Sequence, residues 1–172
     1  LDPHSVEKNI TEHTKAICAV NILGHPAPLL ELKKIADKYN LILIEDNSQA
    51  PDAIHYGSYT GTVGDIGVFS FNRHKVMQSG EGGVMISKNE NLFQKASLFR
   101  NHGEAVVDSF NITDITNTAG LNLRMTEIEA AIALEQFKKL ETLTSLRISL
   151  ADRLTQNLSE IEGIYSPITM PN

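Results

Sequence analysis

The 172-residue sequence has few of the features that most readily assign a protein to a class. Cys18 is its only cysteine, so no disulfide can form within the chain and nothing points to an oxidising compartment. We expect Cys18 to be a small residue of the core. No apolar run is long enough to cross a bilayer, and no basic segment followed by an apolar one begins the chain. The cytoplasm is therefore the expected location.

Positive charge is also scarce. The sequence has 15 Lys and Arg against 21 Asp and Glu, a net charge of -6, and no basic stripe that could neutralise phosphates. Nucleic acid and membrane are therefore not expected as partners. The six histidines include no pair at the spacing of zinc ligands, so no metal site is expected. With 41% hydrophobic residues, the chain can form one ordinary domain with a core.

The first half of the sequence predicts alternating strands and helices. Residues 15–20 form a short apolar strand, and Pro26 and Pro28 open a helix with apolar residues at helical spacing as far as Tyr39. Residues 41–44 are a continuous apolar run, typical of a strand covered on both faces. These elements predict a right-handed βαβ unit with parallel strands, and hence an α/β fold. Ligand-binding groups are expected at the carboxyl ends of such strands.

The second half is more varied. Residues 51–65 predict a loop with a short strand around His55, and residues 67–71 and 83–87 predict two strands. Residues 89–100 predict a helix. No periodicity persists over residues 103–123, and a loop of this length could reach a neighbouring subunit.

A long helix is predicted from Thr126 to about Ile161. Thr126 and Glu129 have the spacing of a capping box at its start. Leucines and isoleucines form a stripe along it. We expect this stripe to pack in the core, although it could instead be exposed where a further domain would cover it.

Lys75 lies on a short turn between a predicted strand and a glycine-rich corner. A lysine held in this way can be desolvated and act as a neutral amine nucleophile. The alternative is an ordinary solvated loop lysine, which is the commoner case for this residue type. Ser70 just upstream, and the acidic strand end at Glu45 and Asp46, favour the functional interpretation.

These segments resemble the DegT/DnrJ/StrS family of pyridoxal-phosphate-dependent sugar aminotransferases, which have the fold of type I aspartate aminotransferases. The family pattern has three motifs in order. A strand ends in Glu-Asp-x-x-Gln, the segment Gly-Asp-x-Gly-x-Phe-Ser-Phe-x-x-x-Lys follows, and Gly-Glu-Gly-Gly comes last. The matching segments here are residues 45–49, 64–75 and 80–83, and residues 100–103 and 120–127 also look like family segments. Their order and spacing fit the family over nearly the whole chain.

The resemblance implies a role for each of five residues. Lys75 would bind pyridoxal phosphate as a Schiff base and then move a proton between the amino donor and the cofactor. Asp46 would hold a proton on the ring nitrogen of the cofactor. The alternative role of Asp46 is to form a turn at the end of its strand. Gln49, at the start of a short helix, would contact the ring near its phenolic oxygen, and Ser70 would bind the phosphate. Asn122 would reach the phosphate of a second subunit.

The resemblance also implies a fold and its extent. We expect a three-layer α/β/α arrangement with a mostly parallel sheet, in which residues 1–124 are part of the large cofactor-binding domain. Residues 125–172 are expected to be a helical segment leading towards a small C-terminal domain. The start at Leu1 and the family's greater length indicate a fragment. It would lack a helix N-terminus for the phosphate and a stacking aromatic group, so we expect weak cofactor binding and little activity from this chain alone.

The implied reaction moves an amino group, expected from glutamate, to a keto group of a nucleotide-linked sugar. Such reactions serve the biosynthesis of cell-surface polysaccharides or secondary-metabolite sugars, and a homodimer is expected. Two alternatives stay open. Some relatives dehydrate deoxysugars with a histidine in place of the lysine, and His74 is one residue early for that role. A non-catalytic binding or regulatory module is the other.

Overall fold

The structure is a computed structural model that describes residues 1–104, 106–116 and 118–169. Its elements, in chain order, are α1 (Pro3–Lys8), β1 (Ala16–Val20), η1 (Ile22–Gly24), α2 (Leu29–Lys38), β2 (Ile42–Asp46), β3 (Ile54–His55), β4 (Ser58–Tyr59), β5 (Ile66–Ser70), β6 (Gly83–Ile86), α3 (Glu90–Arg100), η2 (Asp108–Phe110), α4 (Glu127–Phe137) and α5 (Leu140–Ser159). No helix among these described residues is both long and apolar enough to cross a membrane.

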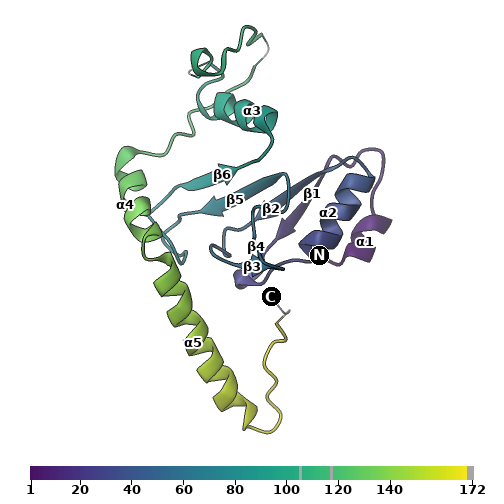
Figure 1. Cartoon of the computed structure of the whole chain (residues 1–172), viewed down its shortest axis with the longest axis vertical. Coiled ribbons are helices and arrows are strands. Elements are labelled where there is room, and N and C mark those ends of the chain that lie inside the picture. Colours follow the sequence, from purple (N-terminus) through teal and green to yellow (C-terminus); the bar gives the residue numbers. More distant parts are fainter. Residues whose placement is uncertain (105, 117, 170–172) are drawn as a thin grey trace.

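The main sheet has the strand order β1-β2-β5-β6 (Figure 1). Strands β1, β2 and β5 are parallel, whereas β6 runs antiparallel to β5. The predicted α/β class with a mostly parallel sheet is confirmed. The short strand predicted around His55 is β3, and it pairs with β4 in a separate two-stranded hairpin.

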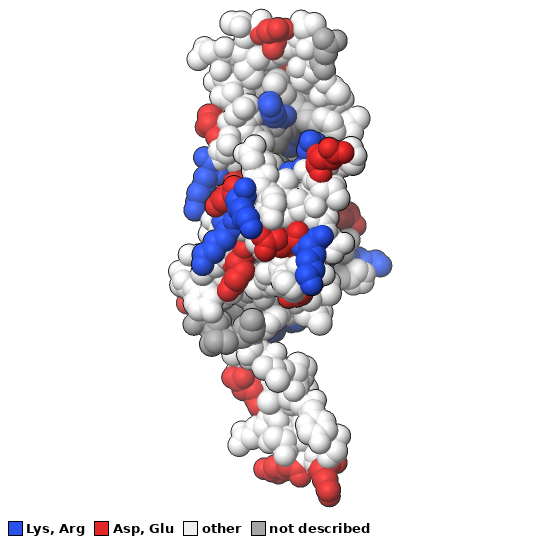
Figure 2. All heavy atoms as spheres, turned by 90° about the vertical axis from the view of Figure 1, so that its right-hand side faces the viewer, with Lys and Arg blue, Asp and Glu red and all other residues white. Residues whose placement is uncertain are grey.

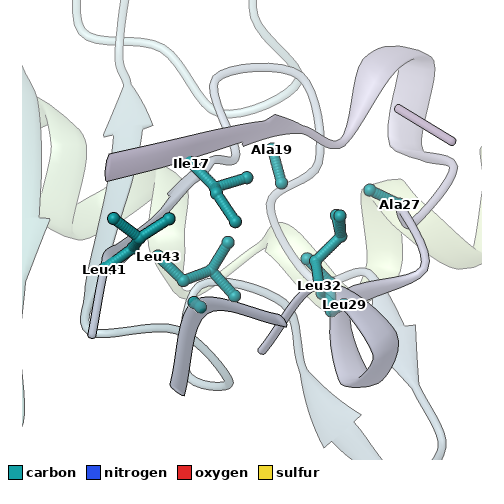
Figure 3. Close-up of a cluster of buried hydrophobic side chains, with 8 residues drawn as sticks. Ile17, Ala19, Ala27, Leu29, Leu32, Leu41 and Leu43 are labelled. Carbon is teal, nitrogen blue, oxygen red and sulfur yellow. The ribbon is translucent and has the colours of Figure 1, made fainter. Parts of the chain in front are cut away.

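The main core lies between α2 and one face of the sheet (Figure 3). Ile17 and Leu43 point from the strands towards Leu29 and Leu32, which the helical spacing of α2 places on its inner side. Cys18 lies between two inward-facing residues of β1, so its side chain points to the opposite face and is exposed. The prediction that Cys18 belongs to the core is therefore wrong, because strand alternation, and not the small size of the side chain, decides which face it lies on.

The opposite face of the sheet is more open among the described residues. Val20 is exposed, and Ile42 and Ile44 are half-buried, although the residues of β2 that alternate with them are fully buried. Figure 2 views the side of the molecule that carries α1 and α2, where basic and acidic side chains are interspersed.

The C-terminal helical segment differs from the prediction in two ways. The predicted single helix is broken at Lys138 and Lys139 into α4 and α5. The prediction that its apolar stripe packs in the core is also wrong for most of the stripe, since Ile128 is 75% and Leu150 is 63% exposed, although Leu140 is buried. Residues 103–104, 106–116 and 118–123 are irregular as predicted, apart from the short 3-10 helix η2.

The predicted capping box at the start of α4 is confirmed. The Thr126 hydroxyl lies 2.7 Å from the Glu129 carboxylate, and the backbone N–H of Thr126 donates to the same carboxylate at 3.1 Å. The hydroxyl also accepts from the Glu129 backbone N–H. The side-chain hydrogen bond from Thr126, followed by the backbone one, lowers the pKa of Glu129 below its usual value.

Replacing Thr126 by valine is therefore expected to raise the pKa of Glu129 towards its ordinary value, which an NMR titration of the Glu129 side chain would measure. A depressed folded-state pKa stabilises the fold above the unfolded pKa, and this stabilisation is lost as the pH falls through the folded value. The variant should therefore lose stability at neutral pH, and this pH-dependent part of the loss should vanish in acid. Thr142→Val, at an exposed position in α5, is the control. An unchanged Glu129 titration would contradict the assignment.

Candidate active site

Two of the predicted site residues end neighbouring parallel strands. Asp46 is the last residue of β2, and Ser70 is the last residue of β5. In the register of these strands Asp46 lies opposite Val68, so Ser70 is two residues further along and on the same face. Both side chains are half-buried. The parallel topology thus brings a carboxylate and a hydroxyl to one edge of the sheet.

Lys75 lies on the connection between β5 and β6, which leaves this same edge and returns to it. The connection is closed by backbone hydrogen bonds of 2.9 Å from Phe71 N to Gly82 O and from Ser79 N to Phe71 O. The Lys75 N–H donates to the carbonyl of Asn72, also at 2.9 Å, which forms a tight turn at the lysine. Gly83 then pairs with Ser70. Lys75 is half-buried within this connection.

A small apolar cluster fixes the connection that carries Lys75. Phe71 and Met77, on either side of the lysine, pack with Ala133 of α4 and Leu140 of α5. Gly82 adopts a φ of +119°, and a Cβ added there would lie 2.9 Å from the sulfur of Met125, which precedes α4. The lysine turn is thus anchored to the C-terminal helices on one side and to β5 on the other.

Asp46 and Gln49 lie in a turn that follows β2. Oδ1 of Asp46 accepts a hydrogen bond of 2.9 Å from the Ser48 N–H, which is the turn-forming role considered as its alternative. In the described part of the chain its other carboxylate oxygen has no hydrogen-bond partner. Gln49 is exposed, and its Oε1 accepts from the Leu23 N–H at 3.0 Å. The short helix predicted at Gln49 is wrong, since these residues form turns.

Ser70 and Asn122 differ in their relation to this edge. Oγ of Ser70 accepts a weak hydrogen bond of 3.3 Å from the Asn72 N–H. Asn122 is exposed on the segment between α3 and α4, where it forms an isolated β-bridge with Asn101. No hydrogen bond among the described residues joins Asn122 to Asp46 or Lys75.

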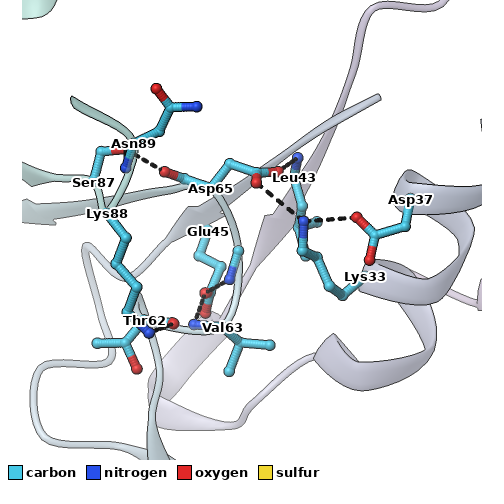
Figure 4. A network of polar contacts seen from close by, with 11 residues as sticks. Lys33, Asp37, Leu43, Glu45, Thr62, Val63, Asp65, Ser87, Lys88 and Asn89 are labelled. Atoms are coloured by element: carbon cyan, nitrogen blue, oxygen red, sulfur yellow. Dashed lines mark hydrogen bonds and ion pairs between the residues drawn. The ribbon is translucent and has the colours of Figure 1, made fainter. Parts of the chain in front are cut away.

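Glu45 is the most buried charged residue of this region, and its burial was not predicted from the sequence. Glu45 is fully buried, and its carboxylate accepts hydrogen bonds from three backbone N–H groups, those of Gly61 at 2.6 Å, Val63 at 2.8 Å and Gly64 at 2.5 Å. Figure 4 shows the carboxylate of Glu45 beside Val63. These residues form the turn that leads into β5. Strand alternation is the signal that could have found it, because Glu45 shares the inward face of Leu43.

Asp65 joins the same strands at the opposite edge of the sheet. Its carboxylate accepts from the Leu43 N–H at 2.8 Å and from Lys33 Nζ at 3.0 Å (Figure 4). Lys33 also donates to Asp37 at 2.8 Å. Burial alone would lower the pKa of Lys33, but hydrogen bonds to the Asp37 and Asp65 carboxylates outweigh it and raise that pKa above its usual value. This network ties the residue that precedes β5 to β2 and α2.

The residues at the carboxyl edge fit pyridoxal phosphate in chemistry. The cofactor needs an amine for its aldehyde, a carboxylate for its ring nitrogen and donors for its phosphate. Lys75, Asp46 and Ser70 supply these three types of group, and Gln49 lies on the turn beside Asp46. Within the described ranges, no three His, Cys, Asp or Glu side chains are grouped as metal ligands would be.

The chain is similar to known proteins in both sequence and structure. It is 38% identical over 170 residues to a putative L-glutamine:3-amino-2,3-dideoxy-scyllo-inosose aminotransferase of Micromonospora echinospora, a match that covers 98% of this chain and 40% of that protein. The structure of DesV from S. venezuelae matches 99% of this chain and 45% of its own with a TM-score of 0.89 and 32% identity. An E. coli GDP-4-keto-6-deoxy-D-mannose-3-dehydratase with bound hydrated PLP matches 99% of this chain and 46% of its own, with a TM-score of 0.83 and 26% identity.

The chain thus spans less than half the length of these relatives. The match to one family nevertheless extends over residues 1–172, the whole sequence. It includes both the strand ends that carry Asp46 and Ser70 and the connection that carries Lys75. The chain belongs to the DegT/DnrJ/EryC1/StrS aminotransferase family.

Proposed function

We propose that the protein is a pyridoxal-phosphate-dependent aminotransferase that transfers an amino group to a keto group of a sugar. The observation that carries this proposal is the arrangement at the carboxyl edge of the sheet. Asp46 and Ser70 end adjacent parallel strands, and Lys75 lies on the connection that leaves and rejoins the same edge. A carboxylate, a hydroxyl and an amine are thus carried by elements that meet at this edge.

Each residue has a distinct task in this proposal. When bound, the cofactor supplies an electron sink that makes the carbon beside the donor's amino group acidic. Lys75 Nζ would hold the cofactor covalently, and once freed it would take the proton from that carbon and deliver it to the cofactor. The Asp46 carboxylate keeps a proton on the ring nitrogen. Ser70 Oγ binds a phosphate oxygen, and Gln49 orients the ring.

The proposed amino acceptor is a keto sugar linked to a nucleotide, and the proposed donor is glutamate. The relative from Micromonospora echinospora is named for glutamine and for a scyllo-inosose, so glutamine and a free cyclitol are tested beside them. A dehydratase is the second candidate, because one of the solved structures with this fold is named as a sugar dehydratase. Lys75, at the position where the resemblance gives the dehydratases a histidine, favours transamination.

We propose further that the protein acts in the cytoplasm as a homodimer. Asn122 supports the second part, because it is exposed on an irregular segment rather than joined to the edge that carries Lys75. From there it would complete the phosphate site of the other subunit.

The purified protein with pyridoxal phosphate is to be incubated with glutamate or glutamine labelled with ¹⁵N at the α-amino group, together with nucleotide-linked keto sugars or a keto-cyclitol. The expected result is ¹⁵N in an aminated sugar, detected by mass spectrometry. Release of ammonia without an aminated sugar would favour the dehydratase. No reaction and no absorbance change on adding cofactor would favour a non-catalytic module.

A further inference from the structure

We propose that a buried pair of amides, Asn21 and Asn47, is a positioning device for Asp46. This inference rests on the proposed function, because it concerns how Asp46 is presented to the ring nitrogen of the cofactor. Neither asparagine is among the residues that the sequence pattern assigns to the site. Asn21 follows β1, and Asn47 follows Asp46 directly at the end of β2.

The two asparagines form a closed hydrogen-bond network in the interior. Asn21 is 0% and Asn47 is 1% exposed. Nδ2 of Asn21 donates to Oδ1 of Asn47 at 2.7 Å, while Oδ1 of Asn21 accepts from the Ala27 N–H at 2.7 Å. Nδ2 of Asn47 donates to the carbonyl of Glu45 at 3.2 Å. Both oxygens and both amide nitrogens therefore have a partner, which is how buried polar groups fix one arrangement of the chain.

The backbone of the pair holds Asp46 from both sides. The Asn21 N–H donates to the carbonyl of Asp46 at 3.0 Å, which ties Asp46 to the connection after β1. The Asn47 N–H, which belongs to the same peptide group as that carbonyl, donates to the carbonyl of Val68 at 2.8 Å and ties the group to β5. The peptide that follows Asp46 is thus anchored on both sides at the point where the strand pairing ends.

The side chain of Asp46 is oriented by the turn that Asn47 begins. The carbonyl of Asn47 accepts from the Ala50 N–H at 3.0 Å, and this turn presents the Ser48 N–H to Oδ1 of Asp46. Loss of the Asn47 amide would leave Nδ2 of Asn21 without a partner in the interior, and the connection after β1 would shift to find one. The carboxylate would then lose its preset direction, although it would still be present.

The test compares pyridoxal phosphate with 1-deazapyridoxal phosphate, an analogue that has a C–H in place of the ring nitrogen. The protein should bind the natural cofactor about tenfold or more tightly than the analogue, because only the former makes a charged hydrogen bond to Asp46. Asn47→Ala and Asn21→Ala should lose most of this preference. Their affinity for the analogue should stay within about twofold of the parent's.

Ser87→Ala is the matched control. Ser87 is half-buried, and its hydroxyl donates to the carbonyl of Asp65 at 2.7 Å, at the opposite edge of the sheet from Asp46. This variant loses one partly buried hydrogen bond but should keep the full preference. Thermal unfolding verifies that each variant is folded, and Asn47→Ser replaces Asn47→Ala if the alanine variant does not fold.

Two other outcomes separate the inference from the function on which it rests. Folded Asn47 and Asn21 variants that keep the full preference for the natural cofactor would overturn the positioning role, while the preference itself would support Asp46 as the partner of the ring nitrogen. A parent protein without any preference, and an Asp46→Asn variant that behaves like it, would instead contradict the role of Asp46 in the proposed function.

Discussion

Replacing Lys75 by alanine is expected to abolish covalent cofactor attachment and to reduce transamination by at least about 10³-fold, because proton transfer by a positioned group alone contributes about 10² to 10⁴. The fold should survive, since Lys75 is only half-buried on a turn and its neighbours Phe71 and Met77 supply the apolar anchors. The measurements are the absorbance of the lysine-bound cofactor, the rate of amino transfer and the thermal unfolding midpoint.

The control for this prediction is Lys34→Ala, which removes an exposed lysine from α2. It should change neither absorbance nor rate. If Lys75→Ala keeps a measurable rate of amino transfer, another amine carries the chemistry. If it unfolds, Lys75 has a structural role that its half-buried position on the turn does not predict.

The second large effect is expected at Glu45. Glu45→Gln should lower the free energy of unfolding by about 3 kcal/mol, because buried N–H donors that lose a charged acceptor cost about this much. The glutamine has the same size, but its NH₂ group would face backbone N–H groups where the carboxylate accepts from three of them. Urea unfolding of the parent and the variant measures the difference.

Glu31→Gln is the matched control, since Glu31 is exposed in the first turn of α2. Its free energy of unfolding should change by less than about 0.5 kcal/mol. A Glu45→Gln variant as stable as this control would mean that the turn of residues 61–64 does not depend on the buried charge.

Much of the fold was predictable because local patterns and tertiary structure agree there. Leu29 and Leu32 follow helical spacing, and the apolar run before Glu45 forms a central strand. The parallel order of these elements then predicts that Asp46 and Ser70 end at one edge. Lys75 was singled out because glycines and a strand end surround it, which is a local signal.

The failures occurred where the environment of a residue depends on distant parts of the chain. Cys18 was placed in the core by size, whereas the phase of its strand exposes it. Glu45 carries a charge that usually indicates the surface, but a turn 16 or more residues later covers its carboxylate and donates backbone hydrogen bonds to it. The apolar stripe of α4 and α5 was assigned to the core, although few described residues pack on it. Each of these depends on contacts between segments that no local pattern records.

The most direct test of the central claim is reduction of the cofactor-loaded protein with tritiated borohydride, followed by protease digestion and peptide mapping. Borohydride reduces the bond between the cofactor and its lysine to a stable amine, so the label marks the attached residue. We predict one labelled peptide with the modification on Lys75, and none in the Lys75→Ala variant. A label on any other lysine, or no label at saturating cofactor, would contradict the claim that Lys75 is the residue around which this site is built.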